Sequence, residues 1–418
     1  MKWSPQQERA LRSCSSWVKD DFANQVFYIA GYAGTGKTTL AQQLVRGGNW
    51  LFAAFTGKAS HVLRQKGCWN AQTIHSLIYR PSGESKGMEI ENLKQEIKEI
   101  FYAAGPERVL LPKETLRVEQ LTKLIKHLEE ENQPRFVLWG DSPLADADVD
   151  GIVIDEVSMV DERLGKDLES FGKKILVLGD PAQLPPVGAG GYFTNREPDI
   201  MLTEVHRHAK ESEILHLATL IREGSPIGQL SKISHYTGDV LFIPRGEPKR
   251  IREEVLAADQ VLCGLNASRH AMNRRHRELI GMNQPIPMKN DRLVCLKNDH
   301  NKGLFNGSQW LVEDSVADLD NKTADMAIKS EDSDKRRIPV EAWLHHMLGC
   351  SDELAQMGFE RRELSEFDWS YALTVHKAQG SQWEKVVLFN ESSSFRGHAT
   401  RWLYTGITRA SKKLVVVV

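Results

Sequence analysis

The chain has 418 residues, which is enough for two or three domains with separate hydrophobic cores. Its 54 basic residues nearly balance its 56 acidic ones, which excludes a uniformly basic surface and requires any nucleic-acid contact to use a local basic groove. The five cysteines include no CxxC pair, which argues against a zinc module or an iron–sulfur cluster and favours a reducing compartment. Because no run approaches the roughly 20 apolar residues of a membrane span and the first residues lack a signal-peptide core, we expect a cytoplasmic protein without membrane contact.

A glycine-rich segment at residues 31–38 is the most informative part of the N-terminal region. It reads Gly-Tyr-Ala-Gly-Thr-Gly-Lys-Thr and matches the phosphate-binding P-loop at every fixed position. The apolar run 25–30 before it predicts a buried strand, and residues 38–45 after it predict a helix. A chance glycine-rich turn would lack this strand–loop–helix context, so we expect the chain to bind ATP.

The P-loop pattern assigns roles to individual residues. Glycines let backbone N–H groups curl around phosphates, and the N-terminus of the following helix adds partial positive charge. Lys37 is expected to reach the β- and γ-phosphates, and the Thr38 hydroxyl is expected to bind Mg²⁺. The predicted nucleotide-binding residues here are Gly31, Ala33, Gly34, Thr35, Gly36, Lys37, Thr38 and Thr39.

Strands and helices alternate along most of the remaining chain. This alternation predicts doubly wound parallel sheets with ligands at the C-terminal ends of the strands. The expected strands after the P-loop are 50–56, 150–154, 174–178, 260–264, 385–389 and 413–418. Helically spaced apolar residues interrupt the first sheet and predict a helical insertion, and short β-like pieces between polar turns predict a β-rich insertion in the second.

These elements predict four parts. They are a first α/β domain (1–78 and 149–190), a helical insertion (79–148), a second α/β domain (191–287 and 366–418) and a β-rich insertion (288–365).

Two carboxylates end the predicted strand 150–154. Asp155 would hold Mg²⁺, mostly through water, because this ion keeps several waters and takes one or two carboxylates. Glu156 would orient and deprotonate the water that attacks the γ-phosphate. The next predicted strand leads into the sequence Gly-Asp-Pro-Ala-Gln-Leu-Pro-Pro, in which the Gln183 carboxamide would sense hydrolysis or would simply be solvated.

Together these segments resemble superfamily 1 helicases of subgroup B, the RecD and Dda type. The resemblance continues in the family's order from residue 4 to residue 410. Its further motifs are Ser-Pro-Gln-Gln (4–7), Phe-Thr-Gly-Lys-Ala (55–59), Thr-Ile-His-Ser (73–76), Leu-Thr-Glu-Val-His-Arg (202–207), Leu-Phe-Asn-Gly (304–307), motif V (371–381) and motif VI (404–410). It implies two tandem RecA-like P-loop domains, with ATP between them and a small SH3-like β-rich insertion in the second.

The resemblance also assigns single residues. Gln7 would read the adenine, and Gly380 of motif V would join the nucleotide site. Arg207 and Arg409 would come from the second domain and meet the γ-phosphate across the cleft, where an arginine typically contributes about 10³–10⁵ in rate. Without its motif as context, each arginine would be interpreted as one partner of a surface ion pair.

The nucleic-acid track is less sharply defined by the residues. A single strand laid across both domains needs hydroxyls and amides for phosphates and flat side chains for bases. The candidates are Phe55, Thr56, Lys58, Thr73 and His75 on the first domain and Thr374, His376 and Lys377 on the second. Phe55 either stacks on a base or packs in the core, and His376 either touches DNA or the domain interface or is structural. Segment 55–59 departs from the family pattern at Phe55 and Gly57, where a proline and a histidine are common.

The resemblance implies an ATP-dependent DNA helicase that uses ATP and Mg²⁺ and moves 5′→3′ on single-stranded DNA. Its expected partners are single-stranded and forked duplex DNA, together with single-strand-binding or replication proteins, and a monomer is expected. Two alternatives are a nucleic-acid-stimulated ATPase that displaces bound protein without unwinding, and a binding protein with an inactive ATP site. The intact set of Lys37, Asp155, Glu156, Gln183 and Arg409 argues against the second. RNA is an alternative track, and a strand-separating aromatic residue is expected in 79–148, with Phe101, Tyr102 and Trp139 as candidates.

Overall fold

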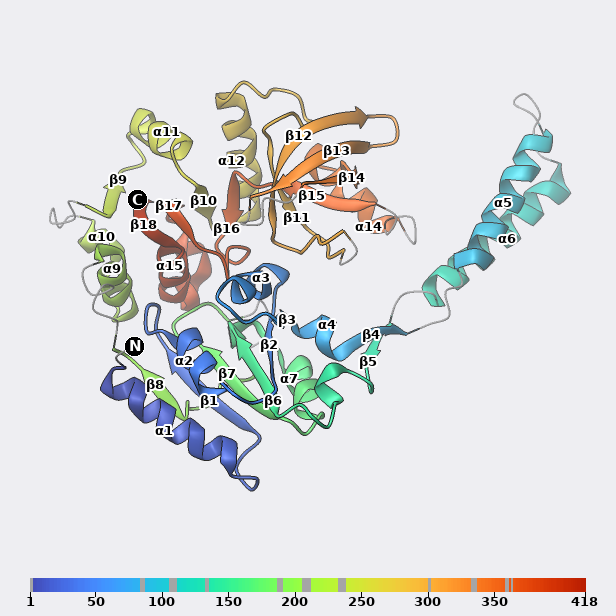
Figure 1. Ribbon diagram of the computed structural model, residues 1–418. Helices are drawn as coiled ribbons and strands as arrows, with labels where there is room; N and C mark the ends of the chain where they lie inside the picture. Colours follow the sequence, from blue (N-terminus) through green and yellow to red (C-terminus); the bar gives the residue numbers. More distant parts are fainter. Residues whose placement is uncertain are drawn as a thin grey trace. The chain divides into compact units, whose positions relative to one another are not determined.

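The computed structural model describes residues 3–82, 87–104, 111–131, 135–185, 191–204, 212–231, 238–299, 302–331, 337–357, 361 and 364–418. Internal contacts divide the chain into two compact units. The larger is made of Met1–Ile78, Asp141–Gly349 and Ser365–Val418, and the smaller of Tyr79–Gly140 and Cys350–Leu364. The larger unit holds two parallel sheets and a small barrel (Figure 1).

The first sheet has six parallel strands in the order β3-β2-β6-β7-β1-β8. These are β3 (Gln72–Thr73), β2 (Trp50–Ala54), β6 (Gly151–Asp155), β7 (Lys174–Gly179), β1 (Val26–Gly31) and β8 (Ile200–Leu202). Every residue of β1 and β2 is buried, as expected for a parallel sheet covered on both faces. The predicted strands 25–30, 50–56, 150–154 and 174–178 are therefore confirmed. β8 lies beyond residue 190, so the first sheet uses more of the chain than predicted.

Helices and short 3₁₀ turns accompany this sheet. They are α1 (Pro5–Lys19), α2 (Lys37–Leu44), α3 (Gly57–Gln65), α4 (Ile74–Ile78), η1 (Pro143–Ala145), η2 (Val157–Met159) and α7 (Glu162–Glu169). Local sequence explains where α1 begins. Ser4 caps it, Pro5 occupies the first turn, and the Gln7 side chain accepts a hydrogen bond from the Ser4 N–H, which completes a capping box.

The second sheet has five parallel strands in the order β16-β10-β17-β18-β9. These are β16 (Ala372–Thr374), β10 (Gln260–Cys263), β17 (Trp383–Phe389), β18 (Ala410–Val417) and β9 (Val240–Ile243). The described helices around it are α9 (Glu213–Arg222), α10 (Ile227–Leu230), α11 (Pro248–Leu256), α12 (Asn266–Leu279), η4 (Ser392–His398) and α15 (Ala399–Ile407).

Alternate residues of the second sheet pack on opposite faces. Leu388 and Leu414 share a core with Ile214 of α9 and Trp402 of α15. Val387, Val415 and Val417 share a separate core with half-buried residues of α11 and α12. The two α/β units predicted from the sequence are thus both present, each with helices on its sheet.

A closed barrel occupies the predicted β-rich insertion. Its strands are β11 (Arg292–Cys295), β12 (Gln309–Asp318), β13 (Thr323–Ser330), β14 (Arg337–Trp343) and β15 (Ser365–Trp369). The short helix α13 (His345–Leu348) lies between β14 and β15 in the sequence. Burial alternates along β12 and β13, because successive side chains point inside and outside. Trp310 and Phe367 fill the interior.

The smaller unit contains the predicted helical insertion. α5 (Gly87–Ala104) and α6 (Pro112–Glu131) pack through Ile97, Ile125 and Leu128, and β4 (Tyr79–Ser82) pairs with β5 (Arg135–Leu138). α14 (Ser351–Gln356) also belongs to this unit. Among the described residues, no helix of either unit is both long and apolar enough to cross a bilayer. The four domain boundaries taken from the sequence stay predictions.

Two buried ion pairs connect α12 to the barrel, one at β15 and one at the residue before β11. Arg269 donates to Asp368 at 2.6 Å, and Arg277 donates to both carboxylate oxygens of Asp291 at 2.9 Å. Asp291 has no exposed surface and also accepts hydrogen bonds from the Met288 N–H and the Tyr371 hydroxyl. Such a pair is stable only while both partners remain, because an unpaired buried charge is costly.

We therefore expect Arg277→Ala to lower the free energy of unfolding by about 3–5 kcal/mol, since it leaves the Asp291 carboxylate buried without its cation. Arg275→Ala is the matched control, because Arg275 lies on the same helix and pairs with Glu278 at the exposed surface. Its change should stay within about 0.5 kcal/mol. Urea titration followed by circular dichroism measures both, and equal effects would contradict the assignment.

Candidate active site

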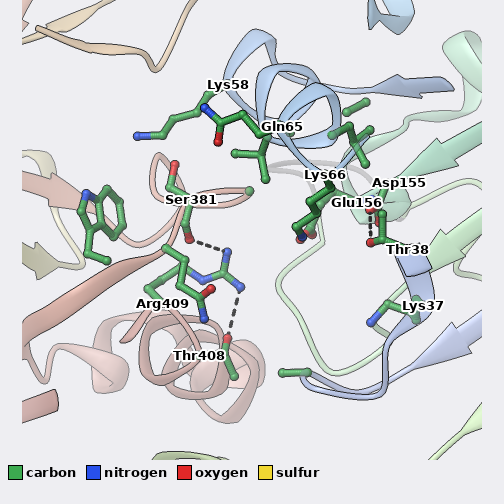
Figure 2. Close-up of a pocket in the computed structure, with 18 of the residues that line it drawn as sticks. Lys37, Thr38, Lys58, Gln65, Lys66, Asp155, Glu156, Ser381, Thr408 and Arg409 are labelled. Atoms are coloured by element: carbon green, nitrogen blue, oxygen red, sulfur yellow. Dashed lines mark hydrogen bonds between the residues drawn. The ribbon is translucent and has the colours of Figure 1, made fainter. Parts of the chain in front are cut away.

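A cavity of about 850 Å³ lies between the C-terminal ends of the first-sheet strands and the second sheet. The P-loop (33–39), Asp155, Glu156 and Gln183 line it from the first sheet. Gly380, Ser381, Thr408 and Arg409 line it from the second. Figure 2 shows Lys37 and Thr38 opposite Thr408 and Arg409 across this cavity. The structure therefore brings together motifs that lie more than 300 residues apart in the sequence.

The P-loop has the backbone that its glycines predict. Gly34 and Gly36 adopt positive φ values of 80° and 76°, a region that L-residues with side chains rarely enter. A Cβ at Gly31 would lie 2.7 Å from the Thr35 hydroxyl, so a larger residue would disturb the loop. The Lys37 ammonium donates to the carbonyls of Gly31 and Tyr32. It is thus held by the loop itself.

The two predicted metal ligands are in direct contact. The Thr38 hydroxyl donates to Asp155 Oδ2 at 2.7 Å, and Asp155 Oδ1 accepts the Glu156 N–H at 2.8 Å. This pairing sets the Asp155 carboxylate at the start of α2, beside the P-loop.

Glu156 occupies an unusual position at the end of β6. Its backbone is left-handed, with φ 54° and ψ 43°, a conformation that is strained for a non-glycine residue and is concentrated at functional sites. Burial raises the pKa of its carboxyl, and Asp155 raises it further, whereas Arg409 and Lys37 lower it. A raised pKa suits a general base, because proton transfer is most efficient when the pKa of the catalytic group lies near the working pH.

The Gln183 carboxamide reaches the same cavity. Its side chain is 6% exposed, and its Oε1 atom has no hydrogen-bond partner among the described residues. A buried carbonyl oxygen without a partner is costly, so it marks a position where a donor such as a water molecule is expected. This geometry favours the sensing role over the solvated alternative.

Arg409 is held by its own domain and is 6% exposed. Its guanidinium donates to the carbonyls of Thr405 and Ser381 at 3.0 Å and to the Thr408 hydroxyl at 3.2 Å (Figure 2). It enters the cavity opposite the P-loop and lowers the pKa of Glu156 by its charge.

Tyr404 links the two sheets, a role that sequence reasoning missed. Its hydroxyl accepts the P-loop Ala33 N–H at 3.0 Å and donates to Asp180 at 2.7 Å. Asp180 is 3% exposed, and burial raises the pKa of its carboxyl while Lys37 and the Tyr404 hydrogen bond oppose that rise. Tyr404 was inside a recognised motif, but only three-dimensional contact shows what its hydroxyl touches.

A second group of hydrogen bonds crosses the same interface. The Thr405 hydroxyl accepts the Leu184 N–H at 3.0 Å, and the Gln379 carboxamide donates to the Leu184 carbonyl at 3.0 Å. Leu184 follows the predicted sensor Gln183 directly. The segment that carries the sensor is therefore bonded to two motifs of the second sheet.

Gln7 and Gly380 differ in how they relate to the cavity. Gln7 is 2% exposed and donates to the Thr35 carbonyl at 3.0 Å, so it joins α1 to the P-loop and is not among the lining residues. Gly380 lines the cavity with a φ of 73°, and a Cβ there would approach Ala59 to 3.1 Å. The adenine contact of Gln7 stays a prediction.

Four of the predicted nucleic-acid residues of the first sheet lie at helix starts or beside them. Thr56 caps α3 by accepting the Ala59 N–H, and Thr73 caps the turn of α4 by accepting the Ser76 N–H. The half-buried Phe55 meets the exposed His75 edge-to-face, with ring centroids 5.7 Å apart. Phe55 and His75 therefore form one aromatic pair.

Lys58 lies apart from that pair. It is 9% exposed, donates to Gln309 at 3.3 Å and lies 5.2 Å from the centre of the Trp383 ring. Its cation thus faces the barrel and the second sheet at the edge of the ATP cavity. The sequence of segment 55–59 alone could not show whether Lys58 contacts Gln309 and Trp383 or a nucleic-acid phosphate.

The predicted nucleic-acid residues of the second sheet lie at the end of β16, where Thr374 is the last residue, and directly after it. Thr374 accepts the Lys377 N–H, and His376 lies 5.4 Å from the Phe395 ring. Burial, with a contribution from Arg269, lowers the pKa of Lys377 to about 8. Lys377 is half-buried, which makes it a weaker candidate for a phosphate contact than a fully exposed lysine.

A groove of about 310 Å³ next to Thr73 holds Trp69, which sequence reasoning missed, and Phe305 of the recognised segment 304–307. Trp69 is 84% exposed at its edge, and Phe305 of the barrel lies under the Arg64 guanidinium at 5.5 Å. The signal available in the sequence was a tryptophan four residues before the predicted track residue Thr73. Arg207 lies outside the described residues. Of the strand-separation candidates, Phe101 and Tyr102 are exposed and Trp139 is half-buried.

These residues fit ATP with Mg²⁺. The loop offers a phosphate cradle with two glycines at positive φ, Thr38 and Asp155 offer paired oxygen ligands, and Gln183 offers a carbonyl oxygen without a partner. Hydroxyl and carboxylate oxygens are ligands that Mg²⁺ prefers.

The model of the AAA domain family matches residues 3–239, which is more than half of the chain. The chain belongs to this family. The model of a UvrD-like helicase C-terminal domain also matches residues 370–417 of this AAA-domain protein.

Sequence relatives extend the comparison. The ATP-dependent RecD2 DNA helicase of Deinococcus radiodurans is 27% identical over an alignment of 288 positions, which covers 64% of this chain and 36% of that protein. An uncharacterized protein of Methanocaldococcus jannaschii is 24% identical over an alignment of 489 positions, which covers 98% of this chain and 38% of that protein. The AAA-domain chain therefore spans little more than a third of the length of these relatives. The predicted resemblance to superfamily 1 helicases of subgroup B is confirmed.

Solved structures agree on the fold. Bacteroides Pif1 bound to ssDNA superimposes with a TM-score of 0.54 at 17% identity, over 100% of this chain and 92% of that one. At that identity the likeness shows the fold alone, and it confirms the predicted pair of parallel sheets with a β-rich insertion.

If Glu156 deprotonates the attacking water, ATP turnover should fall as the pH is lowered through its pKa. Because burial raises this pKa above the ordinary 4.5, the loss should occur at a higher pH than for an exposed glutamate. The measurement is kcat against pH, with folding followed by circular dichroism. Asp180→Asn should keep this acid limb, and an acid limb that disappears in that variant would assign it to Asp180.

Arg409→Ala should separate binding from turnover. We expect nucleotide affinity, measured with a fluorescent ADP analogue, to change by less than about twofold while ATP turnover falls about 10³-fold. Arg401→Ala, which alters an exposed arginine on α15, should change neither. A matching loss of affinity and turnover would place Arg409 in ground-state recognition.

Proposed function

We propose that this chain is an ATP-dependent DNA helicase that couples ATP hydrolysis to 5′→3′ movement on single-stranded DNA and to duplex unwinding. The observation that carries the proposal is the cavity between the two sheets. In it the P-loop, Asp155, Glu156 and Gln183 face Arg409 from the other sheet. The RecD2 relative is named as an ATP-dependent DNA helicase, and the polarity follows the resemblance to the subgroup.

Each group at the cavity has a role in this proposal. Lys37 leaves the carbonyls of Gly31 and Tyr32 and binds the β- and γ-phosphates. Thr38 and Asp155 would hold Mg²⁺, which would supply positive charge beside the phosphate oxygens. Glu156 takes the proton of the attacking water.

The groups that report on hydrolysis complete the site. Gln183 binds the attacking water through Oε1, and Arg409 meets the γ-phosphate. Arg207 is proposed as a second arginine, and Gln7 as the adenine contact.

Hydrolysis becomes motion because the nucleotide touches both sheets. While ATP is bound, Arg409 and the P-loop are drawn to the same phosphate, which favours a closed cleft. After hydrolysis, the hydrogen bonds of Tyr404 and Thr405 to the first sheet are the contacts that opening must break. One ATP per opening and closing then moves the domains along the strand.

For the track, the half-buried ring of Phe55 and the exposed rings of His75 and Trp69 support the proposal most directly. Phe55, His75 and Trp69 lie on the first domain beside Thr56 and Thr73, and stacking a base on one ring typically contributes about 1–3 kcal/mol. Thr374, His376 and Lys377 are proposed to continue the track on the second domain, with Lys58 at the cleft edge. The solved Bacteroides Pif1 neighbour is bound to ssDNA, which supports the same class of ligand here.

The proposed partners are single-stranded and forked DNA, with single-strand-binding or replication proteins as further partners, and the proposed state is a monomer. The deciding experiment is ATP turnover and strand release on a forked duplex with either a 5′ or a 3′ single-stranded tail. Release from the 5′-tailed fork alone is expected. Lys37→Ala is the control, since it removes the phosphate-binding cation and should abolish both turnover and release.

The other outcomes each contradict part of the proposal. Release from the 3′-tailed fork alone would keep the helicase and overturn the polarity. DNA-stimulated turnover without release from either fork would favour an ATPase that displaces bound protein. Turnover that no DNA stimulates would overturn the DNA track.

A further inference from the structure

A second hollow, of about 420 Å³, lies on the far face of the second sheet from α9 and α15. We call it the α11–α12 hollow, because residues of these two helices line it, and it shares no lining residue with the ATP cavity. Figure 1 shows α11 and α12 beside the second sheet. Its apolar lining includes Ile251 and Val255 of α11, Met272 and Leu279 of α12, and Ala372 and Phe389 of the sheet. None of these residues takes part in the ATP site.

The hollow exists because α11 covers the sheet incompletely. No residue of α11 is buried, and Ile251 and Val255, which face the core of Val261 and Val387, remain half-buried. Ala372 contributes only a methyl group at the floor. A helix that turns two branched apolar side chains toward an open hollow leaves apolar surface to water, which a ligand would remove.

Cations surround the hollow and no carboxylate lines it. Lys249 and Arg252 are exposed on the α11 side, three residues apart and so on one face of the helix. Arg275 is exposed on the α12 side, where it pairs with Glu278 at 2.9 Å. Arg245 adds a fourth cation at the rim and donates to the Asn390 carbonyl. This local excess of positive charge contrasts with the formal net charge of −2 of the whole chain.

We propose that the α11–α12 hollow binds an acidic peptide segment of a partner protein. One bulky apolar side chain of the peptide occupies the hollow, and neighbouring carboxylates bind the cations on both sides of its mouth. The chemistry follows from the lining: an apolar floor recognises the anchor, and rim cations steer and orient an anionic chain. This site is independent of the proposed helicase function.

The lining favours a peptide over nucleic acid. Phosphates would pair with the cations but would leave the apolar floor open to water. Stacking would need an open aromatic face, yet Tyr371 is 4% exposed and its ring is stacked on His276 at 4.4 Å. The half-buried Phe389 packs against the core of Val261 and Val387. An apolar side chain with adjacent carboxylates satisfies both the floor and the rim.

The experiment is a fluorescence-anisotropy titration of the full chain with a fluorescein-labelled peptide of four aspartates followed by one phenylalanine. We expect saturable binding that the Lys249→Glu/Arg252→Glu double variant weakens at least about tenfold, because a like charge replaces each attraction. A peptide with alanine in place of phenylalanine should also bind at least about tenfold more weakly, because the hollow then loses its anchor.

Arg250→Glu is the matched control. Arg250 is exposed on the same helix and pairs with Glu247, but it does not line the hollow, so affinity should stay within about twofold. Wild-type protein that shows no saturable binding would overturn the proposal. An equal loss of peptide affinity in Arg250→Glu would also overturn it, and so would an unchanged affinity for the alanine peptide. Displacement of the peptide by an oligothymidylate would overturn it as well, because it would assign the cations to nucleic acid.

Discussion

The Tyr404 hydroxyl satisfies one polar group on each side of the interface between the two sheets. It accepts the N–H of Ala33 in the P-loop and donates to the buried Asp180 carboxylate. Both groups are costly to bury without a partner, so the second sheet is held where Tyr404 can reach the first. The ATP cavity is bounded by the two surfaces that this contact brings together, and its arrangement depends on it.

The same interface explains how a change at the nucleotide can reach the second sheet. Leu184, next to Gln183, is bonded through its N–H to Thr405 and through its carbonyl to Gln379. A displacement at the sensor therefore changes hydrogen bonds to two motifs of the second sheet directly. No long chain of intermediates is needed, because the sensor segment is itself part of the interface.

Sequence alone predicted the local parts of this arrangement well. The glycine conformations of the P-loop, the carboxylates after β6 and the parallel strands are encoded within a few residues, and the structure has them where they were expected. The contacts of Gln7, Lys58 and Tyr404 were not predictable in this way. Each depends on a partner far along the chain: the Thr35 carbonyl, Gln309, and Asp180 with Ala33. The spacing of a motif identifies the segment that belongs to the site, but it does not identify the distant atom that each side chain contacts.

In the cavity, most reactive groups are satisfied by their own domain. Lys37 is bonded to P-loop carbonyls, Arg409 to carbonyls of Ser381 and Thr405, and Thr38 to Asp155, whereas Gln183 Oε1 has no partner among the described residues. A ligand must replace each of these bonds to engage the group, so binding gains only the difference between the new and the old contacts. That difference is largest where a phosphate meets cations from both sheets at once. The closed arrangement is therefore stabilised chiefly by the nucleotide that bridges it, and it weakens when the bridging phosphate leaves.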